Sequence, residues 1–480
     1  MPSPSNLQLT LTGGTDLGSQ LYRQLRDAVL DGRLRDGERL PATRELARDL
    51  AVSRNTVAGA YDRLTAEGFL AARVGAGTFV RTGSGRPRSR RSAPAGVITP
   101  RPVWRELVVS STSEEMTPAY DFRIGIPDGR LFPVQTWRRL LNRQLRTSML
   151  TDARYRAPGG HPSLRAAIAR HLGVSRSVHA AAEDVLVTRG AQQAVDLVAR
   201  VLVEPGDCVV VEDPGYPPVR QLMRSLGARV VPVPVDDEGL VVHALPRQAR
   251  LVHTTPSHQF PMGVAMSLAR RRELVEWAAR HRAAVIEDDY DTEFRYTPRP
   301  LEPLQTLDRY GRVIYVGTFA KTMLPLLRTG FLVAPASLRP ALLAARQLSD
   351  WHGDRPTEAA LAAFLDEGFL ARHIRRAGAA YAERRATLLA AVEAYLADWF
   401  TPAPSAAGLH IALRSRPDAT VDLAALVTSA AEADIGVQAL SDFSADGDHL
   451  GLVLGFGAME AARIRPGVRR LARSVRQFIV

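Results

Sequence analysis

One lysine stands out chemically in this sequence. Arginine supplies every other cationic side chain apart from histidine, and lysine occurs only at Lys321. A guanidinium group stays protonated and cannot form an imine, whereas a lysine amine can lose its proton and attack an aldehyde. The isolated amine therefore predicts Schiff-base chemistry at this position.

The residues near Lys321 are of types that can hold a phosphate beside an aldehyde. Thr318 ends an apolar run just before the lysine, and Arg328 follows the lysine by seven residues. A hydroxyl and a guanidinium can both bind phosphate oxygens. Backbone amides at the start of a helix can bind the same group. The sequence offers such a helix start at Gly190, Ala191 and Gln192.

Acidic and aromatic residues elsewhere could hold the ring of the same molecule. Asp288 and Tyr290 lie at the end of the apolar run AAVIEDDYD, and Tyr216 lies in EDPGYPP. A carboxylate keeps a pyridine nitrogen protonated, a phenol can hydrogen-bond a phenolate oxygen, and a tyrosine ring can stack on the ring face. Singly, each residue could be a loop cap or a core aromatic. Together with Lys321 they predict a pyridoxal 5'-phosphate site.

Such a site needs a sheet that brings the ends of several strands together. From about residue 120, apolar extended runs alternate with helical ones. This alternation predicts an α/β domain with a mainly parallel sheet, whose functional residues lie in loops at the strand ends. The expected strands are 184–188, 208–212, 230–235, 251–256, 283–289 and 313–318.

The first eighty residues have a different pattern, that of three short helices and a hairpin. Apolar residues recur on one face of each expected helix, and Ser53 is a suitable N-cap for the third. The glycines of residues 74–77 allow a tight turn between the extended segments 69–73 and 78–80. The pattern indicates a winged helix-turn-helix. A small helical adaptor with solvated arginines is the alternative.

This segment resembles the winged helix-turn-helix of the GntR family, through LPATRELARDLAVSRNTVAGAYDRLTAEGFL and RVGAGTFV. The resemblance implies that one set of residues contacts double-stranded promoter DNA. Arginine can fork onto guanine or phosphate, asparagine can pair with adenine, and hydroxyls suit phosphate oxygens. The implied DNA-binding residues are Arg44, Ser53, Arg54, Asn55, Thr56, Arg73 and Gly75.

Between residues 81 and 118 the composition changes to arginine, serine, glycine and proline, without a periodic apolar face. This predicts a flexible basic linker, whose arginines either attract DNA non-specifically or are simply solvated. The 480 residues thus divide into an expected DNA-binding domain (1–80), a linker (81–118) and an effector domain (119–480). The formal net charge of +12 is compatible with a polyanionic partner.

The larger part resembles the fold-type I, aspartate-aminotransferase-like domain, and the whole chain is identified as a member of the MocR subfamily of GntR regulators. The motifs are YRAPGGHPSLR, TRGAQQAVDLVARVLVEPGD, EDPGYP, TPSHQFPMG, IEDDYDTEFRY and GTFAKTMLPLLRTGF. The resemblance implies a seven-stranded, mainly parallel sheet with a small C-terminal α+β subdomain. It also implies a head-to-tail, domain-swapped homodimer in which Tyr155 reaches the phosphate of the neighbouring subunit.

Two positions depart from the aminotransferase pattern. Phe260 stands where aminotransferases have an asparagine that hydrogen-bonds the cofactor, and the nearby His258 or Gln259 could replace it. Val453 stands where they have an arginine that binds the substrate carboxylate. Without that clamp, full transamination of α-amino acids is disfavoured.

A replacement clamp could come from Arg220 or Arg295. The main hypothesis is nevertheless a cytoplasmic transcription regulator rather than an enzyme. Its large domain would sense pyridoxal 5'-phosphate, or an amine or amino acid that displaces Lys321 from the imine, and would reposition the winged helices on DNA. The alternatives are an aminotransferase with an appended DNA-binding module, and a scaffold with an incidental cofactor. No membrane partner is expected, because no apolar stretch is long enough to cross a bilayer, and no metal site is expected.

Overall fold

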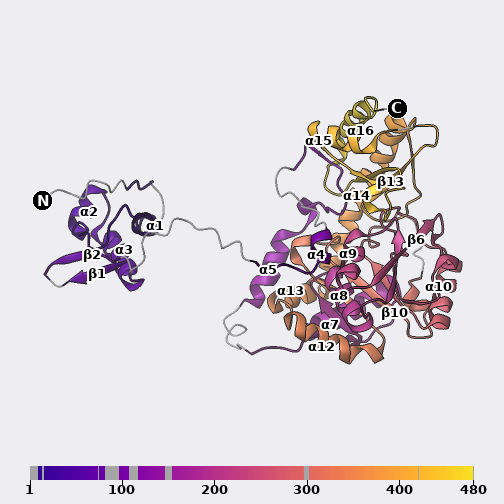
Figure 1. The fold of residues 1–480 in the computed structure, drawn as a ribbon, viewed down its shortest axis with the longest axis horizontal. Helices are drawn as coiled ribbons and strands as arrows, with labels where there is room; N and C mark the ends of the chain where they lie inside the picture. Colours follow the sequence, from indigo (N-terminus) through magenta and orange to yellow (C-terminus); the bar gives the residue numbers. More distant parts are fainter. Residues whose placement is uncertain are drawn as a thin grey trace. The chain divides into compact units, whose positions relative to one another are not determined.

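The computed structural model describes residues 9–12, 16–73, 75–81, 97–107, 117–145, 154–296, 302–419 and 421–478. The chain divides into two compact units, Met1–Pro100 and Arg101–Val480 (Figure 1). Each unit has its own apolar core. Within the described ranges, we find no helix that combines the length and the apolar character needed to span a membrane.

The first unit consists of three helices and a two-stranded hairpin. Its elements are α1 (Leu17–Leu30), α2 (Thr43–Asp49), α3 (Arg54–Ala66), β1 (Leu70–Arg73) and β2 (Gly77–Val80). The helices bury one apolar face each, and the shared core includes Leu25, Val57 and Leu64. The strands pair antiparallel, with Leu70 opposite Val80. The predicted helices and hairpin are confirmed.

Helix α3 begins at the cap that the sequence predicts. Ser53 has extended backbone angles, and its Oγ accepts a hydrogen bond from the Thr56 backbone N–H at 3.1 Å. Ala51, with a φ of 52°, turns the chain between α2 and α3. This cap fixes the end of α3 that carries the predicted DNA-binding residues.

We expect Ser53→Ala to lower the stability of α3 by about 1 kcal/mol, because a helix N–H loses its partner. Native-state hydrogen exchange of the α3 amides measures this loss separately from the second unit. Ser53→Asp keeps a capping oxygen and is the matched control. Equal exchange rates in all three proteins would show that the cap contributes nothing.

The second unit contains a large sheet with the strand order β4-β11-β10-β9-β8-β5-β6-β7. In this order the strands are Val185–Thr188, Gly330–Val333, Val313–Thr318, Ala284–Asp289, Ala249–Thr254, Cys208–Asp213, Arg229–Asp236 and Gly239–Leu240. Strands β10, β9, β8, β5 and β6 are parallel, whereas β11 runs antiparallel to both of its neighbours. The predicted mainly parallel sheet is confirmed, and the two-residue β7 extends it at one edge.

Helices cover both faces of this sheet (Figure 1). They are α5 (Val134–Gln144), α7 (Pro162–Arg176), α8 (Ala191–Leu202), α9 (Pro217–Ser225), α10 (Leu268–His281), α11 (Leu304–Leu307), α12 (Arg339–Asp350) and α13 (Arg355–Asp366). Ile286 and Ile314 share a cluster with α8 and α9, while Val285 and Val313 share another with α10. Strands buried on both faces have nearly continuous apolar sequences, which is why these were recognisable.

The C-terminal part forms a smaller α+β subdomain. Its antiparallel sheet has the order β12-β13-β16-β15, and helix α16 packs on the long helix α14. The bounds are α14 (Phe369–Leu396), β12 (Phe400–Pro402), β13 (His410–Ser415), α15 (Leu423–Glu432), β14 (Ile435–Gly436), β15 (Gln438–Ala439), β16 (Gly451–Gly455) and α16 (Ala461–Val475). Strand β3 (Tyr120–Asp121) pairs with β14, so residues near the start of this unit join its C-terminal subdomain.

The described part of the segment expected as a linker contains a short helix. Helix α4 (Val103–Glu106) lies against α9, and Arg101 Nη2 donates to the Ser225 carbonyl at 3.1 Å. Residues 97–107 are described, whereas 82–96 and 108–116 lie outside the described ranges. The contacts of α4 belong to the second unit, which begins at Arg101.

Candidate functional site

Several predicted residues follow the carboxyl ends of neighbouring parallel strands. Asp288 is the next-to-last residue of β9, opposite Val316 of β10, and β10 ends at Thr318. Lys321 follows three residues later. Because parallel strands end at the same edge of a sheet, this register brings Asp288 and Lys321 to one side of the domain.

Lys321 is half-buried at this edge. Its Nζ donates a hydrogen bond to the Gly125 carbonyl at 2.7 Å. Gly125 has a φ of 79°, and a Cβ atom there would lie 2.8 Å from Nζ. Burial lowers the pKa of the amine, although Asp291 and Asp288 oppose that shift. The lowered pKa increases the share of neutral, nucleophilic amine below pH 10. Gly125 was missed in the sequence, where it is one of many turn glycines.

Asp288 offers an unsatisfied carboxylate oxygen. The residue is buried, and its Oδ1 has no hydrogen-bond partner within the described part of the chain. Its Oδ2 lies 3.4 Å from His253 Nε2. Leaving a buried carboxylate oxygen unpaired is costly, and a protonated pyridine nitrogen would satisfy it. The arrangement therefore fits the ring nitrogen of pyridoxal 5'-phosphate.

Tyr216 is the N-cap residue of α9 and is 39% exposed. Its ring meets that of Phe260 edge to face, with centroids 5.2 Å apart. Burial and the Asp288 carboxylate raise the pKa of the Tyr216 hydroxyl, while Arg328 opposes this rise. Tyr216 thus lies within electrostatic reach of both the predicted ring partner and a predicted phosphate ligand.

The start of α8 and Arg328 form a positively polarised corner. Gly190, with a φ of 88°, is the N-cap and provides no side chain, so the first-turn amides of Ala191 and Gln192 lack a capping group. A Cβ atom at Gly190 would lie 3.6 Å from Arg328 Nη2, which also donates to the Arg189 carbonyl at 3.0 Å. Helix N-termini and guanidinium groups both attract phosphate.

Two further polar groups accompany this corner. Thr318 is buried, and its hydroxyl oxygen accepts from the Ala320 N–H at 3.1 Å. Gln192 Oε1 is buried without a hydrogen-bond partner among the described residues. The structure thus brings together the start of α8, which follows β4, Thr318 at the end of β10, and Arg328 just before β11, as a phosphate site requires.

Tyr290 contacts a histidine rather than standing alone. Its hydroxyl oxygen lies 2.9 Å from His258 Nδ1, which is also 2.9 Å from Asp291 Oδ1. Burial and the surrounding carboxylates raise the pKa of Tyr290 well above its usual value, so the phenol keeps its proton. Sequence reasoning considered His258 but missed Asp291, although it lies in the same IEDDYD motif.

Of the two candidates to replace the missing asparagine, Gln259 is fully engaged elsewhere. Its Nε2 donates to the Pro214 carbonyl at 2.8 Å and to the Phe260 carbonyl at 2.7 Å, and its Oε1 accepts from the Met262 N–H at 3.0 Å. A third contact, at 3.2 Å, joins Nε2 to Glu212. Gln259 therefore shapes the loop before Pro261, and His258 is the residue beside Tyr290.

Val453 lies in an apolar cluster instead of a charged one. It is fully buried on β16, opposite Ala412, and shares a cluster with Met262 and Phe443, against which Phe260 packs. The alternative clamps lie in other surroundings. Burial lowers the pKa of both guanidinium groups, and the charge of a second arginine lowers it further, Arg224 for Arg220 and Arg176 for Arg295.

Tyr155 differs from the other predicted cofactor residues in its high exposure and in its contacts. It is 77% exposed, and its ring contacts are Trp351 at a centroid distance of 4.9 Å and His352 at 6.2 Å. A side chain that serves a neighbouring subunit would be exposed in a single chain in this way.

In the first unit, the predicted DNA-binding residues lie at the starts of two helices and at the hairpin. Arg44 is exposed on α2, and Arg54 and Asn55 are exposed in the first turn of α3. The Arg73 guanidinium lies 5.0 Å from the ring centroid of Phe79, and Gly75 occupies the exposed turn with a φ of 75°. Ser53 and Thr56 form the cap between them, with their hydroxyl oxygens 2.8 Å apart.

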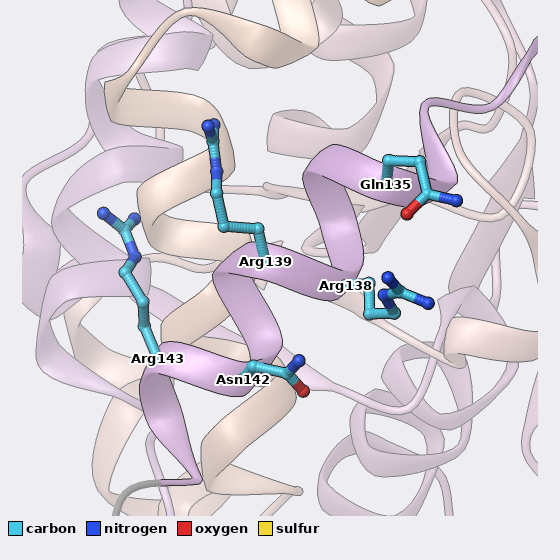
Figure 2. A pocket seen from close by; sticks show the side chains of 5 residues that line it. All are labelled: Gln135, Arg138, Arg139, Asn142 and Arg143. Atoms are coloured by element: carbon cyan, nitrogen blue, oxygen red, sulfur yellow. The ribbon is translucent and has the colours of Figure 1, made fainter.

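A separate basic surface follows α5. Figure 2 shows Arg139 and Arg143 extending side by side from successive turns of the helix. A hollow of about 350 Å³ is lined by Gln135, Arg138, Arg139, Asn142 and Arg143. Arg143 pairs with Glu367, and Arg139 lies 5.6 Å from the Phe369 ring centroid. None of the predicted cofactor residues lines this hollow.

Two known families match this chain, one in each of its two structural units. Residues 17–80 match the family of bacterial regulatory proteins called the gntR family, and residues 119–444 match the aminotransferase class I and II family. The chain is 38% identical to the probable rhizopine catabolism regulatory protein MocR of Rhizobium meliloti, with 94% of this chain and 92% of that protein covered.

A regulator of pyridoxine biosynthesis, PdxR of Corynebacterium glutamicum, is 33% identical over 94% of both chains. Among solved structures, kynurenine aminotransferase of Pyrococcus horikoshii, in complex with PMP and its substrate, has a TM-score of 0.72 and 27% identity. That match covers 78% of this chain and 96% of the aminotransferase. The two regulators thus align with 94% of this chain, whereas the aminotransferase aligns with 78% of it.

Proposed function

Because the chain belongs to the MocR-type GntR transcription regulators and its large domain is a pyridoxal 5'-phosphate fold, we propose that it senses this cofactor, or an amine that competes for it, at Lys321. The resulting change would alter how the winged helices bind promoter DNA. The observation that carries the proposal is the buried Oδ1 of Asp288, which has no hydrogen-bond partner among the described residues and lies at the same sheet edge as the half-buried amine. A purely structural role would leave no reason to bury an unsatisfied carboxylate.

We assign the cofactor contacts residue by residue. Asp288 Oδ1 accepts from the pyridine nitrogen, Tyr216 packs on the ring face, and Tyr290 donates to the ring's O3 oxygen. The phosphate is held by Thr318, Arg328 and the first-turn amides of α8, which include Ala191 and Gln192. When bound, the cofactor supplies an aldehyde that reacts reversibly with amines. Lys321 is the protein amine with which an effector competes.

The apolar surroundings of Val453 favour sensing over turnover. A carboxylate bound there would lie against Met262 and Phe443 without a guanidinium to pair with, and desolvating a charge without a partner is unfavourable. We therefore propose that the effector is the cofactor itself or an amine without a carboxylate at this place. An aminotransferase with an appended DNA-binding module is the second candidate, supported by the fold match alone.

Steady turnover separates these two candidates. We expect an α-amino acid and a 2-oxo acid to be converted at below about 0.1 s⁻¹, roughly a hundredth of the median enzyme rate. The measurement is production of the new 2-oxo acid by the full-length chain saturated with cofactor. Sustained rates of about 10 s⁻¹ would favour the enzyme instead.

The sensing proposal is tested by DNA binding with and without pyridoxal 5'-phosphate. Full-length protein is titrated against a labelled fragment from upstream of its own coding sequence, at fixed salt. The cofactor should change the affinity of the wild-type chain about 5-fold or more, and should have no such effect on Lys321→Ala. Identical affinities of the wild-type chain in both conditions would contradict the proposal.

We also propose that residues 1–80 bind DNA in the cytoplasm and 119–480 form the effector domain of a head-to-tail, domain-swapped homodimer. Tyr155 would then complete the phosphate site of the partner. A mixture of Tyr155→Phe and Lys321→Ala chains should contain dimers with one intact site, because the two substitutions meet in the other site. Cofactor retention during dialysis should exceed that of either variant alone. No gain after subunit exchange would show that Tyr155 does not act across a dimer.

A further inference from the structure

A buried histidine–carboxylate pair lies directly behind the Tyr290 phenol. The side chains of His258 and Asp291 are at most 2% exposed, and Nδ1 of His258 lies 2.9 Å from Asp291 Oδ1. The same Nδ1 lies 2.9 Å from the Tyr290 hydroxyl oxygen. His258 follows β8, and Tyr290 and Asp291 follow β9.

The Asp291 carboxylate decides which hydrogen His258 donates. Asp291 Oδ1 can only accept, so the facing Nδ1 of His258 carries a hydrogen. On the other side of the ring, the Ser405 hydroxyl oxygen lies 3.2 Å from Nε2 and 3.0 Å from the Ala407 carbonyl. The Tyr290 oxygen accepts a share of the Nδ1 hydrogen.

This leaves the hydrogen of the Tyr290 phenol unused by His258. Were Nδ1 of His258 without its hydrogen, the phenol would donate to that nitrogen and would no longer be available to a ligand. An N–H that donates to the phenolic oxygen also polarises the phenol, which makes its O–H a stronger donor. The His258–Asp291 pair thus both orients the phenol and strengthens it as a donor.

The imidazole has little freedom to leave this position. A Cβ atom at Gly408 would lie 2.1 Å from His258 Cε1, and one at Gly263 would lie 3.2 Å from Nε2. The two glycines allow backbone from the 258–263 loop and from the segment before β13 to close on the ring. The His410 ring is a further neighbour, with centroids 4.8 Å apart.

A metal site is the competing interpretation, since His258, Asp291 and His410 present ligand atoms within 4.8 Å of one another. A metal needs a ring nitrogen without its proton. His258 Nδ1 donates to Asp291 and its Nε2 is hydrogen-bonded to Ser405, while His410 Nε2 lies 3.0 Å from the Pro261 carbonyl. These hydrogen bonds favour the His258–Asp291 pair over a metal site.

We propose that His258, held by Asp291 and Ser405, is a positioning residue that directs the Tyr290 phenol at the O3 oxygen of pyridoxal 5'-phosphate. It would take the place of the asparagine for which this chain has Phe260. The inference rests on the proposed function, which assigns Tyr290 to O3. The proposal gives the buried histidine a role, because the Phe260 side chain cannot donate a hydrogen bond.

Other titratable groups also act electrostatically on this phenol and its neighbours. Four carboxylates raise the pKa of Tyr290: Asp288, Asp289, Asp291 and Glu212. Asp291 and Asp288 also act on Lys321, and His258 and Lys321 act on His410. Substituting His258 removes the donor behind the phenol and also leaves the Asp291 carboxylate without its partner, so Asp291→Asn is measured beside it. The effect of the His258 substitution should therefore depend on the presence of the Tyr290 hydroxyl.

The test is a pH titration of the visible absorbance of the bound cofactor. A strong donor at O3 stabilises negative charge on that oxygen, which lowers the pH at which the bound chromophore loses its proton. His258→Phe should raise the midpoint by about one pH unit, and Asp291→Asn should raise it by less. His281→Gln, a histidine substitution on the outer helix α10, should leave the midpoint unchanged.

A double-mutant cycle distinguishes positioning from general disruption. Tyr290→Phe should raise the midpoint by itself, and His258→Phe should add nothing further in that background. An unchanged midpoint in His258→Phe, or an equal further shift in the Tyr290→Phe background, would overturn the proposal. If His258→Phe does not fold, Asp291→Asn and His258→Asn in the same cycle decide. Failure of the proposed function would instead appear as absorbance that persists in Lys321→Ala.

Discussion

Lys321→Ala is expected to abolish the visible absorbance of the bound cofactor and its covalent retention. The side chain is the only lysine amine in the chain, so no neighbouring lysine can replace it. Its half-buried Nζ sits against the Gly125 carbonyl, at the same sheet edge as Asp288, and burial lowers its pKa towards the neutral, nucleophilic form. The loss should be essentially complete rather than graded.

Borohydride reduction followed by peptide mass analysis provides the measurement. In the wild-type chain, the cofactor fixed by reduction should appear in the one peptide that contains Lys321. In Lys321→Ala, no peptide should carry it. Lys321→Arg is the matched control for charge, because a guanidinium keeps the positive charge but cannot attack an aldehyde. Cofactor fixed on the N-terminal amine, or absorbance that survives in either variant, would refute the assignment of the attachment site.

The second large effect is expected at the start of helix α3. Arg54→Ala should weaken binding to promoter DNA about 10- to 100-fold at physiological salt, since a bidentate arginine contact with a base is worth about 1–3 kcal/mol. Arg54 is exposed in the first turn of α3, beside Asn55 and directly after the Ser53 cap. The substitution removes no core contact, because Arg54 is not part of the apolar cluster of this unit.

The control is Arg33→Ala, an exposed arginine of the same unit that pairs with Asp31 at 3.6 Å. It removes the same charge away from α3, so it isolates the effect of position from that of net charge. Fluorescence anisotropy at several salt concentrations separates a base contact from a phosphate contact, because only loss of the latter reduces the salt slope uniformly across sequences. Equal losses in Arg54→Ala and Arg33→Ala would contradict the predicted recognition helix.

The sequence by itself determined the features that depend on residue type and local spacing. Strands buried on both faces are continuous apolar runs, so β5, β8, β9 and β10 were recognisable as segments. The cap at Ser53 and the turn at Gly75 follow from local backbone chemistry. A unique lysine is visible without any fold.

Only the tertiary structure decided which distant residues meet. Strand β11, which was not foreseen, inserts antiparallel between β4 and β10, and its placement depends on a sheet register that no local pattern encodes. The same holds for Gly125, which lies 196 positions from Lys321 and supplies the carbonyl that holds its amine. Turn glycines are common, and nothing in the local sequence marks this one.

The choice between His258 and Gln259 shows the physical reason most clearly. Both are polar neighbours of Phe260, and their residue types allow either one to donate a hydrogen bond. In the folded protein, the Gln259 amide donates to loop carbonyls. Asp291 and the distant Ser405 instead bind the two ring nitrogens of His258. Residue types determine which hydrogen bonds are possible, whereas long-range packing decides which donors remain free for a ligand.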